Sequence, residues 1–355
     1  MLAQDTKDTT GSSRLAVEPE AIARVDKILT QMTRDGTFTG SVLIAQDGNI
    51  LLSRGYGFAD RAHGIPNTPG TRFLLGSITK QFTAMGILIL QSQGKLNVND
   101  SICSYITGCP REWQDITIHH LLTHTSGLSS QLSDRLYREI ESATSGPVEP
   151  VEQVRYLGLT SQWSLDTQPG ERYAYNNFGY ILLAHIIEGI SGQSYADFLE
   201  QAIFAPLEMR NTGYQDASSG VAKVYTDHDD TTGAQFGSPP VSEGSGHLYS
   251  TSEDFFLWDQ ALYADQLLPQ SELDQAFEPF VRATEFPGFG YGYGWFVGEV
   301  QGRPVVAGAG GGPAFATLII RYPKDQLTMI VLTNQGHIDH FAIWGLISNE
   351  LFGKT

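Results

Sequence analysis

The feature that most restricts the fold of this chain is the position of its β-strand patterns near the two ends of the sequence. Close to the start, the apolar runs 41–45 and 50–53 flank Asp47-Gly48, a dipeptide typical of a tight β-hairpin turn. The main further strand patterns come late in the chain, at 294–297, 304–306, 316–320 and 327–332. We expect the hairpin to join the late strands in one antiparallel sheet, so the sequence between them forms an insertion.

Helical patterns fill the middle of the sequence. Apolar residues recur with helical spacing over 82–90, 180–190 and 195–204, and glycine, proline, serine and aspartate separate these segments. Helices are also predicted over 21–33 and from about 339 to 351.

These patterns predict an α/β protein, in which an antiparallel sheet flanked by helices carries an inserted, mainly helical lobe. The α/β lobe is expected to comprise about 20–76 and 245–355, and the helical lobe about 77–244. Together they form a single domain, 20–355, which follows a polar and flexible leader, 1–19.

The charge of the chain disfavours some classes of partner. The sequence carries 39 acidic residues against 22 lysines and arginines, a formal net charge of −17, which argues against nucleic acid or an anionic membrane as a partner. No apolar run reaches the roughly 18 residues that a membrane-spanning helix needs, so no membrane span is expected. The hydrophobic share of 41% predicts a globular protein with a sizeable core.

A serine and a lysine three residues apart, Ser77 and Lys80, stand where a β-like run, 71–75, turns into an apolar helix. Unpaired backbone N–H groups at a helix start favour a negatively charged oxygen near the serine. A buried ammonium loses part of its preference for the charged form, so Lys80 can accept or relay the proton of the serine. The second Ser-x-x-Lys, Ser92 to Lys95, falls at the far end of this helix, where carbonyl groups point outward. An ordinary serine at a helix start is the alternative interpretation of Ser77.

The sequence Tyr-Asn-Asn at 175–177 precedes an apolar helix that starts near Gly179, which predicts a loop position for Tyr175 and Asn177. A phenol near an ammonium can move a proton between a nucleophile and a leaving group, and an amide can orient a lysine and a substrate. A buried tyrosine beside a helix-capping asparagine is the other interpretation of these residues.

The glycine-rich sequence 308–313 is expected to lie between the strands that end at Val306 and begin near Phe315. Glycines allow a backbone to approach a ligand closely and to offer its N–H groups. A phosphate loop is excluded, because no Gly-Lys-Ser/Thr follows the glycines.

Cys103 and Cys109 are the only cysteines, and they lie close together in a segment that contains proline and glycine. A disulfide between them favours a periplasmic or secreted protein, with a signal peptide that lies outside this sequence. Two free thiols in a cytosolic protein are the alternative.

Three motifs in this order resemble those of the serine β-lactamase and penicillin-binding-protein family, nearest the class C β-lactamases and related esterases and peptidases. They are the Ser-x-x-Lys at 77–80, the Tyr-x-Asn at 175–177 and the glycine-rich 308–313. The segments 120–128, 249–254 and 291–295 are similar to family sequence as well. The resemblance covers about residue 20 to the end, and it implies one catalytic domain with the β-lactamase/transpeptidase-like fold.

The resemblance also implies an acyl-enzyme mechanism that needs no cofactor. Ser77 is then the nucleophile, Lys80 and Tyr175 move protons, and the N–H groups of Ser77 and Gly311 form the oxyanion hole. The residues implied in substrate binding are Asn177, Gly308, Gly310 and Gly311.

The third motif departs from the family pattern at Gly308, where relatives carry lysine or histidine. In relatives that basic residue helps to bind a substrate carboxylate, so β-lactamase and carboxypeptidase activity are disfavoured. The glycine is expected to leave extra room in the pocket for uncharged or bulky acyl compounds.

Histidines raise the question of a metal, because His120 and His124 are four residues apart and follow His119. No third ligand with suitable spacing is evident, so no metal is expected, and the resemblance places this run in structure that lines the site. His247 stands where relatives more often carry glycine, and a compensating catalytic role is one hypothesis for it.

The sequence therefore predicts a serine hydrolase that acts on an ester or amide of a small molecule or peptide. A carboxylesterase or a peptidase for D-residue, peptidoglycan-type substrates ranks first. A weak class C-like β-lactamase and a non-catalytic, penicillin-binding-like protein are the alternatives.

Overall fold

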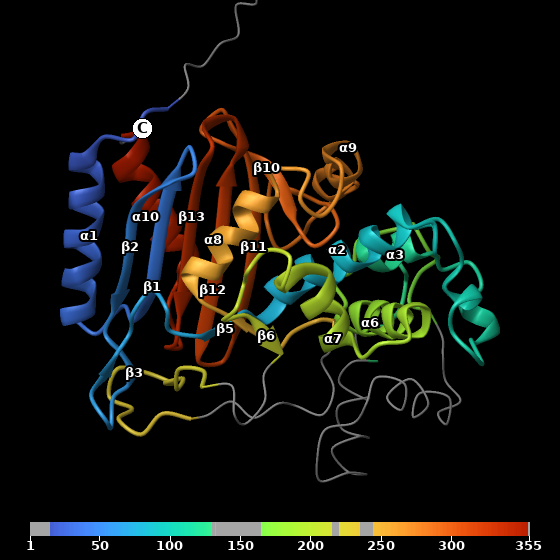
Figure 1. Ribbon diagram of the computed structural model, residues 1–355, viewed down its shortest axis with the longest axis horizontal. Coiled ribbons are helices and arrows are strands. Elements are labelled where there is room, and N and C mark those ends of the chain that lie inside the picture. Colours follow the sequence, from blue (N-terminus) through green and yellow to red (C-terminus); the bar gives the residue numbers. More distant parts are fainter. Residues whose placement is uncertain (1–14, 130–131, 133–164, 215–219, 235–243, 354–355) are drawn as a thin grey trace, which may run out of the picture.

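The computed structural model describes residues 15–129, 132, 165–214, 220–234 and 244–353. Within them, an antiparallel sheet has the strand order β2-β1-β13-β12-β11-β10-β9-β8 (Figure 1). The N-terminal hairpin, β1 (Gly40–Gln46) and β2 (Asn49–Tyr56), joins the C-terminal strand β13 (Leu327–Thr333). The predicted antiparallel sheet with flanking helices is confirmed.

The other strands of this sheet are β12 (Phe315–Tyr322), β11 (Arg303–Gly312), β10 (Phe296–Val300), β9 (Gly290–Tyr291) and β8 (Val281–Arg282). A second sheet has the order β5 (Phe73–Leu74), β7 (Leu248–Ser250) and β6 (Gly213–Tyr214). The strands β3 (Phe58–Asp60) and β4 (Ile65–Pro66) form a separate pair.

Helices cover both faces of the large sheet. On one face lie α1 (Pro19–Arg34) and α10 (His340–Phe352), and on the other lies α8 (Ser252–Ala261) (Figure 1). Alternate residues of a strand point to opposite faces, so in β1 Val42 belongs to the apolar cluster of α1 and α10 while Leu43 belongs to the cluster that contains Trp258 of α8. Every residue of β12 is buried because both of its faces are covered.

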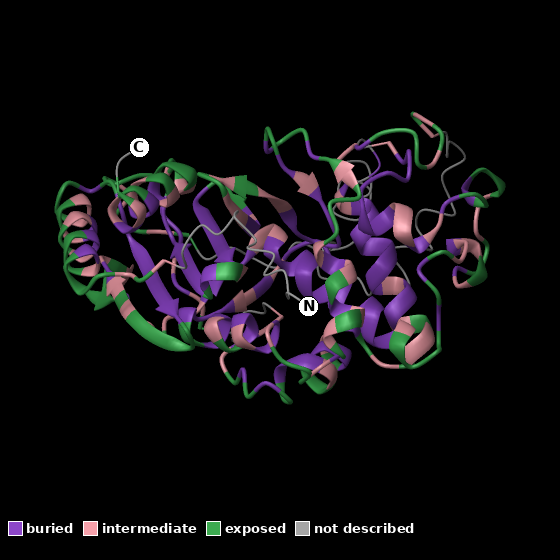
Figure 2. Ribbon diagram, turned by 90° about the horizontal axis from the view of Figure 1, so that it is seen from above, coloured by how far each residue is buried: buried purple, intermediate pink, exposed green. Residues whose placement is uncertain are grey.

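The inserted lobe is built around α2 (Thr79–Ser92), which is buried at each position from Thr79 to Leu90. It packs against α6 (Asn177–Ser191), and α3 (Ile118–Leu122) and α7 (Tyr195–Leu199) pack against α6 in turn. Figure 2 shows buried residues concentrated in these helices and in the sheet. The predicted apolar helix after Ser77 is thus the central helix of this lobe.

Short helical elements complete the described part of the chain. They are the 3₁₀ turns η1 (Gly76–Ile78), η2 (Ile102–Ser104), η3 (Arg111–Trp113), η5 (Asp274–Phe277) and η6 (Pro323–Asp325), the π-helical η4 (Glu200–Phe204), and α9 (Gln270–Leu273). No helix among the described residues is both long and apolar enough to cross a membrane.

The structure differs from the prediction at the leader. Helix α1 begins at Pro19, and residues 15–18 are held against the sheet. The Leu15 N–H donates to Asp325 Oδ1 at 2.8 Å, and the Val17 N–H donates to Gln46 Oε1 at 3.1 Å. A flexible leader over the whole of 1–19 is therefore wrong for its last residues, while residues 1–14 lie outside the described part, as does 133–164 of the expected helical lobe.

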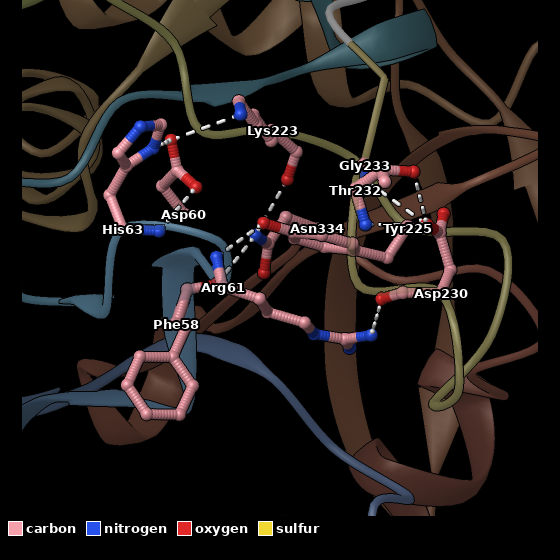
Figure 3. Close-up of polar contacts among 10 residues, drawn as sticks. All are labelled: Phe58, Asp60, Arg61, His63, Lys223, Tyr225, Asp230, Thr232, Gly233 and Asn334. Atoms are coloured by element: carbon pink, nitrogen blue, oxygen red, sulfur yellow. Dashed lines mark hydrogen bonds and ion pairs between the residues drawn. The ribbon is translucent and has the colours of Figure 1, made fainter.

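Hydrogen bonds join the segment 220–234 to the strand pair β3–β4 and to the residue that follows β13 (Figure 3). The Arg61 guanidinium donates to the backbone carbonyls of Asp227, at 2.8 Å, and Asp230, at 2.7 Å. Its carbon lies 4.0 Å from the centre of the Tyr225 ring. The Asn334 amide, directly after β13, donates to the carbonyls of Phe58 and Lys223 (Figure 3).

The disulfide between Cys103 and Cys109 closes a short loop that begins within η2. Both cysteines pack against the apolar core that contains α2 and α6.

Candidate active site

Ser77 lies where the chain passes from β5 into α2 through the 3₁₀ turn η1. The turn needs a positive φ of 55° at Gly76, a conformation that glycine adopts without strain. It places Ser77 at the wall of a cavity of about 150 Å³. The residues lining this cavity are Leu74, Gly76, Ser77, Asn177, Ser245, Gly246, His247, Gly311, Gly312 and Phe315.

Lys80 is almost completely buried, with 1% of its surface exposed, and its amine reaches three oxygen atoms. Lys80 Nζ lies 3.1 Å from Ser77 Oγ, 2.8 Å from Asn177 Oδ1 and 2.8 Å from the backbone oxygen of Ser245. Burial holds the pKa of the lysine well below its ordinary value of 10.5. Lys80 therefore loses its proton, and becomes a neutral amine, at a lower pH than a solvated lysine does.

The direction of the amine lone pair follows from these contacts. The oxygens of Asn177 and Ser245 only accept hydrogen bonds, so they use both N–H groups of a neutral Lys80. The remaining lone pair then faces the Ser77 hydroxyl, the third neighbour of Nζ.

Tyr175 approaches the serine from the segment before α6. Its hydroxyl donates to Ser77 Oγ at 2.8 Å, and Lys80 Nζ lies 4.9 Å from the centre of its ring. Asn176 is the N-cap of α6, since its side chain accepts from the Phe178 N–H at 2.8 Å. Asn177 is the first residue of the helix, so the predicted loop position is correct for Tyr175 and wrong for Asn177.

An aromatic cluster packs against Tyr175, and its central residue is His124, which the sequence presented as a metal-ligand candidate and the resemblance placed in structure that lines the site. The His124 ring lies 4.3 Å from the Tyr175 ring and 4.9 Å from the Tyr291 ring, between ring centres. His124 Nδ1 accepts from the Asn176 N–H at 3.2 Å, so the ring proton sits on Nε2, which lies 3.2 Å from the Tyr291 hydroxyl. Burial holds the His124 pKa well below its ordinary value of 6.5, so the ring is neutral.

The glycine-rich sequence is not a loop, because β11 continues through Gly312 and pairs with β12, with Gly311 opposite Ala316. Its glycines allow this strand to lie directly against the serine turn. A Cβ atom built on Gly310 would lie 2.0 Å from the Leu75 carbonyl oxygen and 3.0 Å from the Ser77 nitrogen. The backbones of Ser77 and Gly311 therefore meet at the edge of the cavity, as an oxyanion hole requires.

Gly308 does not leave extra room in the pocket, and that expectation is wrong. Its α-carbon is buried and faces the side chain of Gln81, whose Nε2 would lie 1.9 Å from a Cβ atom at position 308. Gln81 is itself 1% exposed, and its Oε1 accepts from the Trp258 indole at 3.2 Å. The space beside the glycine is filled by an amide from α2, and the cavity is lined by Gly311 and Gly312 but not by Gly308 or Gly310.

The three histidines at 119–124 do not converge on one point. His120 Nδ1 accepts from the Thr117 N–H in the capping box of α3, and His119 Nδ1 lies 2.8 Å from the Tyr293 hydroxyl. His124 follows the end of the helix with a φ of 57°. Within the described residues, no group of three or more histidine, cysteine, aspartate or glutamate side chains could hold a metal ion.

Comparison with known proteins gives the class of this site. A match to the family described as Beta-lactamase spans residues 25–348. The chain is 32% identical over 341 residues to penicillin-binding protein 4* of Bacillus subtilis (strain 168), covering 89% of this chain and 73% of that protein. It is 28% identical over 321 residues to the teichoic acid D-alanine hydrolase of Staphylococcus aureus (strain MRSA252), covering 87% and 73%. The solved structure of the octameric penicillin-binding protein homologue from Pyrococcus abyssi matches with a TM-score of 0.80 and 26% identity, covering 94% of this chain and 78% of that one.

The chain therefore belongs to the Beta-lactamase family. It is a serine hydrolase of the β-lactamase-related type, and the predicted resemblance is confirmed.

Proposed function

We propose that this hydrolase is a carboxylesterase that forms an acyl-enzyme on Ser77. The observation that carries the proposal is the pair of contacts on Ser77 Oγ, 3.1 Å to the buried Lys80 amine and 2.8 Å to the Tyr175 hydroxyl. A serine placed between a phenol and a lysine amine whose pKa is lowered by burial has a base for its proton and an acid for the leaving group.

In the acylation step, the Ser77 hydroxyl proton moves to Lys80 Nζ while Oγ forms a bond to the ester carbonyl carbon. The carbonyl electron pair moves to oxygen, and the N–H groups of Ser77 and Gly311 hold the resulting oxyanion. When the oxyanion collapses, the bond to the leaving oxygen breaks and that oxygen takes a proton from Tyr175, which Lys80 reprotonates. Water then attacks the acyl-enzyme through the same groups in reverse.

The cavity favours esters over substrates that carry a carboxylate beside the scissile bond. Among the described residues that line it, none bears a positive charge at neutral pH. A missing charge-assisted hydrogen bond is worth about 1.5–3 kcal/mol, or about 10- to 100-fold in kcat/KM. We therefore place a β-lactamase or carboxypeptidase activity below an esterase activity.

A D-aminoacyl ester is the second candidate substrate. The relative from Staphylococcus aureus is described as a D-alanine hydrolase acting on teichoic acid, and such an ester joins a small acyl group to an alcohol. The net charge of −17 favours the approach of a cationic acyl group of this kind.

We also propose that the protein is exported to the periplasm or secreted. The Cys103–Cys109 disulfide supports this, because such bonds persist in oxidising compartments. Thiol titration of the unfolded, unreduced protein isolated from its own cell envelope should detect no free thiol, and two free thiols would contradict the proposal.

Covalent labelling tests the nucleophile. A fluorophosphonate should add one label to the wild-type protein and none to Ser77→Ala, as read by intact-protein mass spectrometry. Ser92→Ala is the matched control, because Ser92 has the same Ser-x-x-Lys spacing but lies exposed at the last residue of α2. A label retained by Ser77→Ala would overturn the assignment.

A further inference from the structure

His247 is the only ionisable side chain among the described residues that line the cavity beside Ser77. Its backbone has a φ of 73°, which residues other than glycine rarely adopt. The cavity that it lines has about 150 Å³ of space, a volume that in a protein core holds a ligand of about the size of benzene.

The main chain on both sides of His247 is anchored to the catalytic helix. Before it, the Ser245 oxygen accepts from Lys80 Nζ at 2.8 Å. After it, the Leu248 N–H donates to Thr79 Oγ1 at 3.3 Å, and the Leu248 oxygen accepts from the Leu75 N–H at 2.8 Å. The backbone on both sides of His247 is therefore held by α2 and by Leu75, which lies between β5 and η1, so the position of His247 relative to Ser77 is fixed.

We propose that His247 is a specificity-determining residue whose imidazole closes one side of the acyl pocket and restricts it to short acyl groups. The proposal rests on the proposed esterase function, since it names the acyl group which that site takes. Phe315 and Leu74 supply apolar surface in the same cavity, and Gly311 and Gly312 supply backbone. Among these lining residues, His247 is the one whose truncation to glycine removes a ring while also relieving a strained backbone.

The imidazole also bears on which short acyl groups fit. Burial lowers the pKa of His247 to about 4, so the ring is neutral at pH 7 and forms no ion pair with a carboxylate. A neutral ring can still exchange a hydrogen bond with a polar acyl substituent. We therefore expect the side of the pocket formed by the His247 imidazole to accept short acyl groups that lack a carboxylate.

The test compares p-nitrophenyl acetate, butyrate and octanoate in the wild type and in His247→Gly. We expect the ratio of kcat/KM for octanoate to that for acetate to rise by at least about 10-fold in the variant, the gain from burying two more methylene groups. His247→Asn, whose side chain is smaller and tolerates positive φ, should raise the ratio less. His337→Gly is the matched control, because His337 has a φ of 59° but lies exposed and apart from the cavity lining, and its ratio should stay that of the wild type.

The possible outcomes distinguish the role of His247 from the proposed esterase function. An unchanged ratio in both His247 variants, each hydrolysing acetate, would overturn the role of His247 and leave the esterase intact. Failure of the wild type to hydrolyse any of the three esters would overturn the esterase and the inference with it. Should His247→Gly fail to fold in a thermal melt, His247→Asn decides by the same ratio.

Discussion

At the scale of single residues, the contacts of Lys80 determine which protonation state can serve Ser77. When the Lys80 amine is neutral, the two carbonyl oxygens take its N–H groups and only the lone pair remains for the serine, whereas a charged Lys80 donates to Ser77 Oγ. We predict that Lys80→Ala and Tyr175→Phe each lower kcat by about 100-fold or more, a magnitude typical of lost general acid–base catalysis. The double variant should lose much less than the product of the two, because the residues act on one oxygen as a unit. Loss equal to the product would indicate independent roles.

The pH dependence follows from the same amine. A base must be unprotonated, so kcat/KM should rise with pH through the pKa of Lys80, and burial moves that rise well below 10.5. The residual kcat/KM of Lys80→Ala should lack this rise with pH when the variant and the wild type are both measured with a neutral ester. An identical acid limb in the variant would assign it to another group.

Gly308 and Gln81 form a pair whose packing can be measured. We predict that Gly308→Ala lowers the free energy of unfolding by about 1–3 kcal/mol, because the new Cβ atom overlaps Gln81 Nε2. Adding Gln81→Ala should recover part of this loss, which a double-mutant cycle in urea would detect. Gly189→Ala is the control, since a Cβ atom there meets nothing within 4 Å and alanine suits the helix α6. Strict additivity would contradict the overlap.

At the scale of elements, a buried ion pair joins α8 to the large sheet. Arg321 Nε of β12 lies 2.7 Å from Asp259 Oδ1 of α8, and the two side chains are 2% and 0% exposed. Removing one buried partner leaves the other charge unpaired, so Asp259→Asn should lower the free energy of unfolding by about 3–5 kcal/mol.

The surface pair Arg24–Glu350 provides the comparison for this prediction. It joins α1 to α10 with the same 2.7 Å separation, but its side chains are 55% and 22% exposed. Glu350→Gln should therefore change the free energy of unfolding by about 0–1 kcal/mol. Similar losses for both variants in urea titrations would show that burial does not set the strength of these pairs.

Elements were predictable where their sequence pattern is long. The hairpin, α1, α2, α10, β12 and β13 have apolar periodicity over many residues, and the structure places them as expected. The strands β8 and β9 escaped prediction because each has two residues, too few for a pattern. The glycine run was expected between two strands because glycine disfavours strands in isolation, but it belongs to β11, since pairing with β12 needs only backbone groups.

At the scale of the whole molecule, the net charge of −17 acts on substrates before they bind. We predict that kcat/KM for butyrylcholine falls as ionic strength rises from about 10 to 300 mM, because salt screens the attraction of a cation to the acidic protein. The matched substrate is 3,3-dimethylbutyl butyrate, which has the same shape without the charge and should respond little. Equal salt dependence for the two esters would show that the field at the site does not follow the net charge.

The amino-acid sequence alone determined the sheet with its inserted helical lobe, the order of the three motifs, and the placement of Ser77 and Ser92 at opposite ends of one helix, because periodicity and helix polarity are local properties. Tertiary structure decided what surrounds those residues. Segments far apart in the chain bring the His124 ring against Tyr175, the Gln81 amide against Gly308, and His247 into the lining of the cavity. Contacts of this kind arise from packing between elements, and no local pattern in the sequence encodes them.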